Sequence, residues 1–82
     1  MIGERFVSDL RHWARAQPRL VGKVLDLVET VRRDPYSGIG KPEPLKHLGS
    51  GLWSRRITDE HRLVYRVEGN LVTLLAARGH YE

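Results

Sequence analysis

The sequence predicts an α+β fold in which an antiparallel pair of helices packs on one face of a twisted, mainly antiparallel sheet. Apolar residues recur at helical spacing before residue 34, and apolar and polar residues alternate after residue 51, as they do in strands. Only short turns separate the predicted strands, which favours antiparallel pairing of successive strands. Because the helices precede the strands, we expect the helix pair to cover one face of the sheet and to leave the other face open.

The first helix is predicted over residues 5–16, where four apolar positions share one helical face. These positions are Phe6, Leu10, Trp13 and Ala14. Gln17 ends this helix because the residue before a proline avoids the α region. Pro18 in turn suits the first position of the next helix.

The second helix is predicted from Pro18 to Asp34, and it carries a wide apolar stripe. The stripe consists of Leu20, Val21, Val24, Leu25, Leu27, Val28 and Val31. Since the connection between the two helices is very short, they should pack as an antiparallel hairpin.

Four strands are predicted after a loop at residues 36–43, which contains glycine and proline but no periodicity. The strands are expected at residues 45–48, 52–58, 61–67 and 71–77. Turn residues separate them, namely Gly49-Ser50-Gly51, Asp59-Glu60 and Glu68-Gly69-Asn70.

Strand alternation assigns the arginines of the third strand to the open face. Arg62 and Arg66 alternate with Leu63 and Tyr65, so these two arginines should point away from the helices.

The second strand contains two adjacent arginines, which must point to opposite faces. If Trp53 and Ile57 are core residues, Arg56 points to the open face and Arg55 is expected at a rim of the sheet. Both arginines could equally be edge-strand charges that limit aggregation.

Length and composition indicate one small domain, residues 1–82, with a single two-layer core. The chain has no cysteine, which excludes disulfides and thiolate metal sites. The four histidines lack ligand spacing, so no metal or other cofactor is expected. No segment is apolar enough for a signal peptide or a membrane span, and we therefore expect a cytoplasmic protein.

The charge balance is basic, with fourteen Lys and Arg against ten Asp and Glu. Most of the cations are arginines, whose planar guanidinium can form two hydrogen bonds to one phosphate. This balance favours a polyanion such as a nucleic acid as partner. The alternative is an ordinary solvated surface that is rich in arginine.

The open face and its rims hold the groups needed to cleave RNA without a metal. These candidates are Glu43, Lys46, Arg56, Glu60, Arg62, His80 and Tyr81. A base can take the proton of the ribose 2′-hydroxyl, an acid can protonate the departing 5′ oxygen, and cations can stabilise the charge at the phosphate. From residue types alone the signal is weak, because such residues are also common in solvated loops and chain ends.

The other histidines offer alternatives to His80 as the acid. His47 lies in a predicted strand, and His61 alternates with Leu63, so it is expected to pack or to cap a turn. His12 is expected at the surface.

Three stretches carry a more specific signal: GKPEPLKH at residues 40–47, SGLWSRRITDEHRLVY at residues 50–65 and ARGHY at residues 77–81. Together they resemble the YoeB-type toxins (Txe/YoeB family) of bacterial toxin–antitoxin modules, within the RelE-like superfamily. The resemblance runs without gaps from the second helix to Tyr81. It implies a ribosome-dependent endoribonuclease that cuts mRNA in the decoding site and inhibits translation.

The resemblance also implies a role for each matching residue. The family's general base falls on Glu43, its phosphate clamp on Arg62 and its general acid on His80. The tyrosine that follows, Tyr81, would be a positioning or stacking group. Supporting positions fall on Lys46, Arg56 and Glu60, and we add Arg55 and Arg66 as further RNA-binding cations of the same strands.

Three departures from the family pattern lead to further expectations. A β-strand begins the family fold, but only Met1 to Glu4 precede the first helix here, so a missing or shortened strand should expose a sheet edge. Gly79 replaces an aromatic residue, and glycine should loosen the tail. Glu82 extends past the usual terminal tyrosine, where its carboxylate would raise the pKa of His80.

The partners implied by the resemblance are mRNA and the ribosome, a cognate antitoxin similar to YefM, and a second copy of the chain in a homodimer. Operator DNA would be bound only through the toxin–antitoxin complex, and no membrane partner is expected. One alternative is a catalytically impaired module that binds RNA, the ribosome or the antitoxin and acts in operator autorepression. Another is a degenerate toxin retained only as a partner of its antitoxin.

Overall fold

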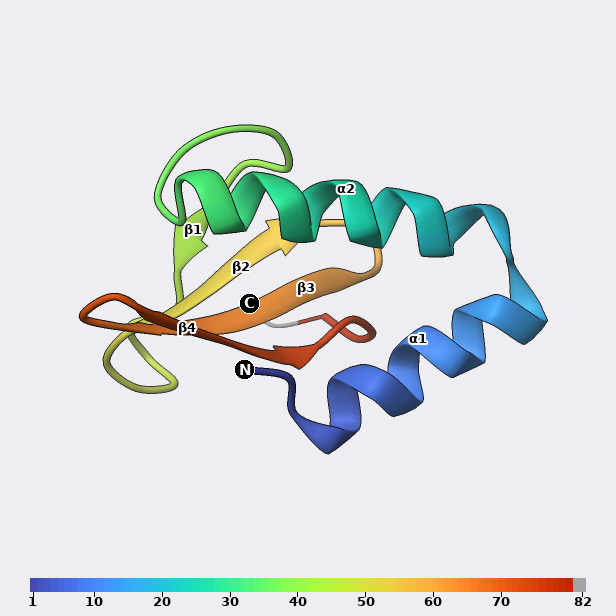
Figure 1. Ribbon diagram of the computed structural model, residues 1–82, viewed down its shortest axis with the longest axis horizontal. Helices are drawn as coiled ribbons and strands as arrows, with labels where there is room; N and C mark the ends of the chain where they lie inside the picture. The colour runs from blue at the N-terminus through green and yellow to red at the C-terminus, as the bar shows by residue number, and fades with distance from the viewer. Residues whose placement is uncertain (81–82) are drawn as a thin grey trace.

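The computed structural model describes residues 1–80 and shows two helices followed by a four-stranded sheet (Figure 1). The elements are α1 (Glu4–Ala16), α2 (Arg19–Arg33), β1 (Glu43–Pro44), β2 (Leu52–Arg56), β3 (Arg62–Glu68) and β4 (Leu71–Ala76). The strands lie in the order β1-β2-β3-β4, and each neighbouring pair is antiparallel. The predicted α+β class is thus confirmed.

Both helices place their apolar stripes on the same face of the sheet, and they diverge from the short connection at Gln17 and Pro18 (Figure 1). The resulting core cluster contains Phe6, Trp13, Leu20, Val24, Leu27, Val31, Ile57, Leu63, Tyr65, Leu74 and Ala77. Two buried hydrogen bonds fix α1 to the end of β4. Trp13 Nε1 donates to the carbonyl of Ala77 at 2.8 Å, and the Ala77 N–H donates to Asp9 Oδ2 at 2.9 Å.

The first strand of the sheet differs from the prediction, since the strand expected at residues 45–48 does not form. β1 consists of Glu43–Pro44, and residues 46–48 form a turn. Proline is tolerated in β1 because this edge strand needs hydrogen-bond donors on one side only. Leu45 instead anchors the segment, with its N–H donating to the Leu52 carbonyl at 2.8 Å and its side chain buried.

The face of the sheet away from the helices is also less open than expected. A second, smaller apolar cluster lies there, formed by Leu45, Leu52, Val64 and Ala76. Val64 alternates with Leu63 and Tyr65 of the main core, so the two clusters lie on opposite faces of β3. Glycine-rich turns before β2 thus allow the chain to fold Leu45 back over this second face.

The residues before α1 cover the sheet edge that was expected to be bare. Ile2 forms a parallel bridge with Leu74 of β4. The Leu74 N–H donates to the Met1 carbonyl and the Gly3 N–H donates to the Leu74 carbonyl, both at 2.8 Å. A short parallel pairing therefore takes the place of a full strand along β4.

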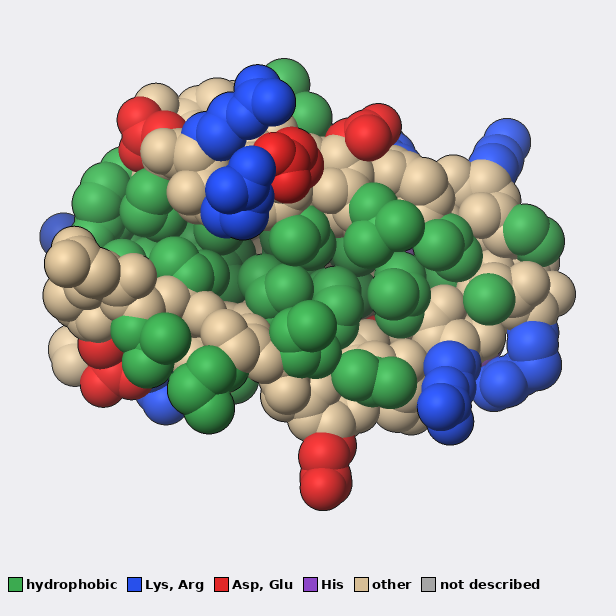
Figure 2. Space-filling model, viewed as in Figure 1, with side chains coloured by type: hydrophobic (Ala, Val, Ile, Leu, Met, Phe, Trp, Pro, Cys, Tyr) green, Lys and Arg blue, Asp and Glu red, His purple; other side chains and the backbone are tan. Residues whose placement is uncertain are grey.

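An apolar groove lies between the diverging helices. Figure 2 shows hydrophobic side chains gathered in a band across this face of the molecule. The groove has a volume of about 440 Å³ and includes Ile2, Val7, Leu10, Leu25 and Val28 in its lining. Of these, Ile2, Val7 and Leu25 are well exposed.

Arg55 lies in the core, and the prediction that it occupies a rim is wrong. Its alternation with Trp53 and Ile57 directs it toward the helices, and its exposed fraction is 0%. Main-chain carbonyls of the loop after α2 surround the guanidinium. Nη2 donates to the carbonyls of Asp34 and Ser37 at 2.6 and 2.9 Å, and Nη1 donates to that of Ile39 at 3.1 Å. Arg55 thus holds this loop and is not placed to bind RNA.

Tyr65 completes the contacts of Arg55. Its hydroxyl oxygen accepts from Arg55 Nε at 3.1 Å, and the same hydroxyl donates to the Pro35 carbonyl at 2.6 Å. Burial raises the pKa of Tyr65 above its ordinary value of 10.0, because the ionised form would lose its hydration.

We expect Tyr65→Phe to lower the free energy of unfolding by about 1–3 kcal/mol, because two buried polar groups lose their partner. Above pH about 10, tyrosine ionises first in the unfolded chain. The folded state retains its proton to a higher pH, so the contribution of Tyr65 is present below that range and is lost as pH rises through it. Urea denaturation of both proteins between pH about 7 and 11 would test this. A constant difference across that range would contradict it.

Candidate active site

The strand registers place the main site candidates on the face away from the helices. Residues opposite each other in antiparallel strands point to the same face. Glu43 lies opposite Ser54, and Arg56 lies opposite Arg62. Arg56 and Ser54 are two residues apart on β2, so Glu43, Arg56 and Arg62 lie within two adjacent rows of one sheet face.

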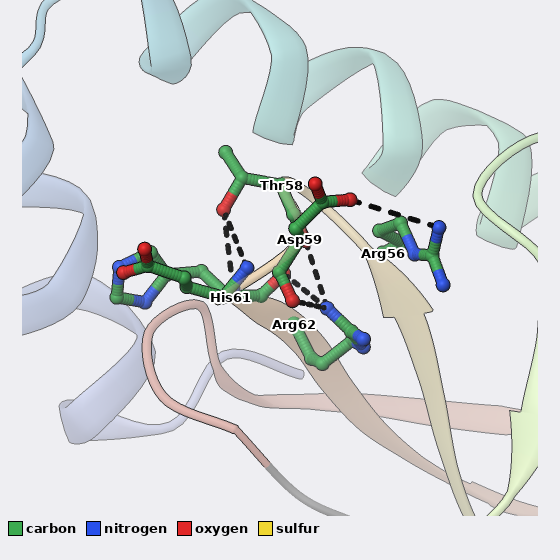
Figure 3. Close-up of polar contacts among 6 residues, drawn as sticks. Arg56, Thr58, Asp59, His61 and Arg62 are labelled. Atoms are coloured by element: carbon green, nitrogen blue, oxygen red, sulfur yellow. Dashed lines mark hydrogen bonds and ion pairs between the residues drawn. The ribbon is translucent and has the colours of Figure 1, made fainter.

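Arg62 is held by the turn between β2 and β3. Its Nη1 donates to the carbonyls of Thr58 and Asp59 at 2.8 and 3.0 Å (Figure 3). The turn is closed by Thr58, whose Oγ1 accepts from the N–H groups of Glu60 and His61. Arg62 shares its face with Val64, as predicted, although the exposed fraction of the residue is only 7%. The guanidinium therefore has an orientation set by main-chain carbonyls.

His80 is brought to Arg62 by the chain that follows β4. The Arg62 N–H donates to the Gly79 carbonyl at 3.0 Å, and the Gly79 N–H donates to His61 Nδ1 at 3.0 Å. Gly79 adopts a φ of 109°, in the region that favours glycine. Rather than loosening the tail, this glycine is hydrogen-bonded on both sides. It places His80, which is exposed, directly beyond the start of β3.

Arg56 lies beside Arg62 but makes different contacts. Its Nη1 is 3.8 Å from Asp59 Oδ1, a loose ion pair in which the carboxylate is almost fully exposed. Figure 3 shows Arg56 reaching toward Asp59 while Arg62 points to the turn carbonyls. The two cations thus share a row of the sheet without competing for one acceptor.

The remaining candidates lie outside this group. Arg66 is opposite Leu52, four residues along β3 from Arg62 and hence about 13 Å away along the strand. Lys46 follows Leu45 in the exposed turn at the same end, and Glu60 is exposed in the β2–β3 turn. Tyr81 and Glu82 lie outside the described residues, so the expectations for them stay predictions.

The structure also identifies residues that sequence reasoning did not assign to the site. Thr58 and Asp59 orient Arg62, and a Thr-Asp pair before a strand is a recognisable signal for a side-chain-closed turn. His61 was expected to pack or cap a turn, and it does both. Its ring lies edge-on to Trp13 with centroids 4.7 Å apart, and its Nδ1 caps Gly79.

One sheet face carries the Glu43 carboxylate and the guanidinium groups of Arg56 and Arg62, and the chain at the end of this face continues into His80. These groups can accept a proton, hold a phosphate and donate a proton, respectively. Within residues 1–80, no group of three or more His, Asp or Glu side chains could hold a metal ion. In the same part of the chain, no helix is long and apolar enough to cross a membrane.

Comparison with protein families gives a match over nearly the whole chain. The family model for the "YoeB-like toxin of bacterial type II toxin-antitoxin system" matches residues 3–81. Toxin YoeB of Escherichia coli K12 is 51% identical over 74 residues, which cover 90% of this chain and 88% of that protein. The YoeB/ParE toxin from Agrobacterium tumefaciens has a similar structure, with a TM-score of 0.91, 43% identity, and coverage of 99% of this chain and 96% of that one.

Two similar structures from Staphylococcus aureus include further protein chains. A YoeB dimer matches with a TM-score of 0.88 and 34% identity, over 99% of this chain and 94% of that one. A YoeB–YefM complex matches with a TM-score of 0.84 and 35% identity, with the same coverage.

Proposed function

The chain belongs to the family of YoeB-like toxins of bacterial type II toxin–antitoxin systems, and from this membership we propose that it is a ribosome-dependent endoribonuclease. It would cut mRNA in the decoding site and thereby stop translation. The observation that supports this proposal best is the shared sheet face of Glu43, Arg56 and Arg62, with His80 joined to it through the Gly79–Arg62 hydrogen bond.

In the proposed reaction, the Glu43 carboxylate takes the proton of the ribose 2′-hydroxyl, whose oxygen then attacks the adjacent phosphorus. Arg62 and Arg56 stabilise the negative charge that develops on the phosphate oxygens. His80 in its protonated form donates a proton to the departing 5′ oxygen, which leaves a 2′,3′-cyclic phosphate on the upstream fragment. The buried, carbonyl-bound position of Arg62 suits its role, since a pre-oriented donor needs no reorganisation during the reaction.

Lys46 and Arg66, toward the other end of the sheet, and Glu60, in the turn that holds Arg62, would contact flanking nucleotides or the ribosome. Tyr81 would position or stack on a base. No cofactor takes part in this proposal.

A cognate antitoxin similar to YefM would neutralise the toxin, as the antitoxin half of the family's name and the S. aureus complex suggest. The S. aureus dimer is the basis for proposing self-association of this chain. Operator DNA would be contacted through the antitoxin complex. Because ribosomes are the site of action, the protein would act in the cytoplasm.

Mapping the 5′ ends of cellular mRNA after brief expression of the protein tests the proposal. New 5′ ends are expected within open reading frames, at positions that correspond to the decoding site of a ribosome on the message. They should be absent when the antitoxin is co-expressed. Arrested translation without new 5′ ends would instead support the alternative of a module that binds RNA or the ribosome without cutting.

A further inference from the structure

A second cationic surface begins at Arg56 and extends around the edge of the sheet. Beyond Ser54, β2 has no strand partner on its outer side, and the loop before β1 covers it. Between this loop and α2 lies a cleft of about 290 Å³, to which Lys23, Lys41 and Arg56 contribute. One acidic residue, Asp26, also lines the cleft. Three cations against one carboxylate give this cleft a positive charge.

The loop wall of the cleft is held close to β2. The Arg56 N–H donates to the Gly40 carbonyl at 2.6 Å. Gly40 has a φ of 85°, and a Cβ atom there would lie 2.8 Å from Leu27 Cδ2, so the loop approaches α2 as closely as a glycine permits.

Lys41, the next residue, has a φ of 50°, a conformation that side-chain-bearing residues rarely adopt. Such strain persists where the surroundings fix the chain, and it is characteristic of functional sites. Lys41 is therefore presented to the cleft from a fixed backbone.

Arg56 connects this cleft with the candidate active site. It lies directly opposite Arg62 in the sheet. Its Nε is buried and has no hydrogen-bond partner among the described residues, and its one ion pair is loose. A buried donor without a partner costs free energy, and turning the guanidinium toward an anion in the cleft would recover it.

We propose that this cleft binds a backbone phosphate of the mRNA next to the scissile phosphate, with Lys23 and Lys41 as the binding residues and Arg56 shared between the two phosphates. This inference rests on the proposed function. RNA is favoured over an acidic protein segment because the cleft is continuous with the site through Arg56, and a polynucleotide presents its anions at regular intervals along one path. The Lys23 and Lys41 ammonium groups suit single phosphate oxygens as compact charges.

The test combines a protein variant with a modified message. Programmed ribosomes would carry mRNAs in which one phosphate near the cut is replaced by a neutral methylphosphonate, at each position in turn. Under single-turnover conditions, one position should slow cleavage by the wild type about tenfold, as expected for one charge-assisted hydrogen bond. With Lys23→Gln/Lys41→Gln, the unmodified message should be cut about tenfold more slowly. The same methylphosphonate should then have a much smaller further effect, because only Arg56 remains to contact that phosphate.

The matched control is Arg15→Gln/Arg19→Gln, which removes the same charge from exposed positions near the helix connection. It should keep the wild-type response to the modified phosphate. A faster reaction is also expected for one variant. Asp26→Asn removes the carboxylate from the cleft and should speed cleavage about twofold to threefold. A folding defect could not produce a faster reaction.

If the wild type cuts the message but no flanking position shows this dependence on Lys23 and Lys41, the inference is wrong and the proposed function stands. Such a result would leave an acidic protein segment as the occupant that the cleft fits. If the wild type does not cut the unmodified message at all, the proposed function fails and the inference fails with it.

Discussion

Glu43→Gln lowers the rate of mRNA cleavage on programmed ribosomes by about 10²–10⁴-fold, the contribution expected of a general base. The amide keeps the shape of the side chain but cannot take the 2′-hydroxyl proton. His80→Gln should have an effect of similar size through loss of the acid. Both side chains are exposed, so these variants should unfold at the same urea concentration as the wild type. Cells that express either variant should continue to grow.

The control is Glu68→Gln, which alters an equally exposed carboxylate at the far end of β3. It should leave both the cleavage rate and the growth arrest unchanged. Arg62→Ala differs from the other site variants, because the Arg62 guanidinium donates to the carbonyls of Thr58, Asp59 and His61, and its loss should reduce stability as well as activity. Full toxicity of both Glu43→Gln and His80→Gln would exclude the proposed mechanism.

Arg55→Met should destabilise the fold by about 3–5 kcal/mol, as expected when a buried charged hydrogen-bonding group is removed and its partners remain. Methionine approximates the length of the arginine stem but cannot donate to the carbonyls of Asp34, Ser37 and Ile39 or to the Tyr65 hydroxyl. Small domains are stable by only about 5–15 kcal/mol, so this loss removes a large part of the stability, and at the lower end of that range a substantial unfolded fraction is expected.

Urea denaturation followed by circular dichroism would measure this loss. Arg33→Met provides the comparison. Arg33 is exposed, and its Nε forms a surface ion pair with Glu29 Oε1 at 3.7 Å. Surface ion pairs of this kind contribute little to stability, so the free energy of unfolding should change by less than about 1 kcal/mol. Equal midpoints for the two variants would contradict the structural role of Arg55.

Local periodicity was sufficient to predict most of the fold. The helix bounds differ from the prediction by at most one residue at each end, and the strands at Leu52, Arg62 and Leu71 begin within one residue of their expected starts. These elements are specified by alternation and by turn residues that act over short distances. Where the chain pairs weakly, as at β1 and before α1, pattern alone was insufficient, because two or three residues carry no period.

The burial of Arg55 shows a different limit. The alternation with Trp53 and Ile57 correctly predicted the face of β2 to which Arg55 points. The sequence pattern, however, offered no partner for a buried guanidinium. The partners are main-chain carbonyls 16 to 21 residues earlier in the chain. Carbonyls occur at every residue, so nothing in the side-chain sequence marks those that converge.

For the candidate site, residue types were not sufficient, and the roles assigned to individual residues rest on the motif resemblance and stay predictions. A glutamate, a histidine and several arginines occur in many basic domains, and composition alone did not distinguish His80 from His47 or His61. The fold gives His61 a structural role and pairs the Gly79 carbonyl with the Arg62 N–H, so His80 directly follows the residue that contacts Arg62.

The hydrogen bonds from Arg55 to the loop after α2 have a consequence for how the candidate active site responds to heating. Surface loops ordinarily melt before the interior does. Here the segment leading to Glu43 cannot unfold locally without leaving the Arg55 guanidinium buried and without its main-chain hydrogen-bond partners. Unfolding of this loop is therefore coupled to unfolding of the whole domain. The proposed activity and the folded structure should then be lost in a single transition, with no compact but inactive intermediate on heating.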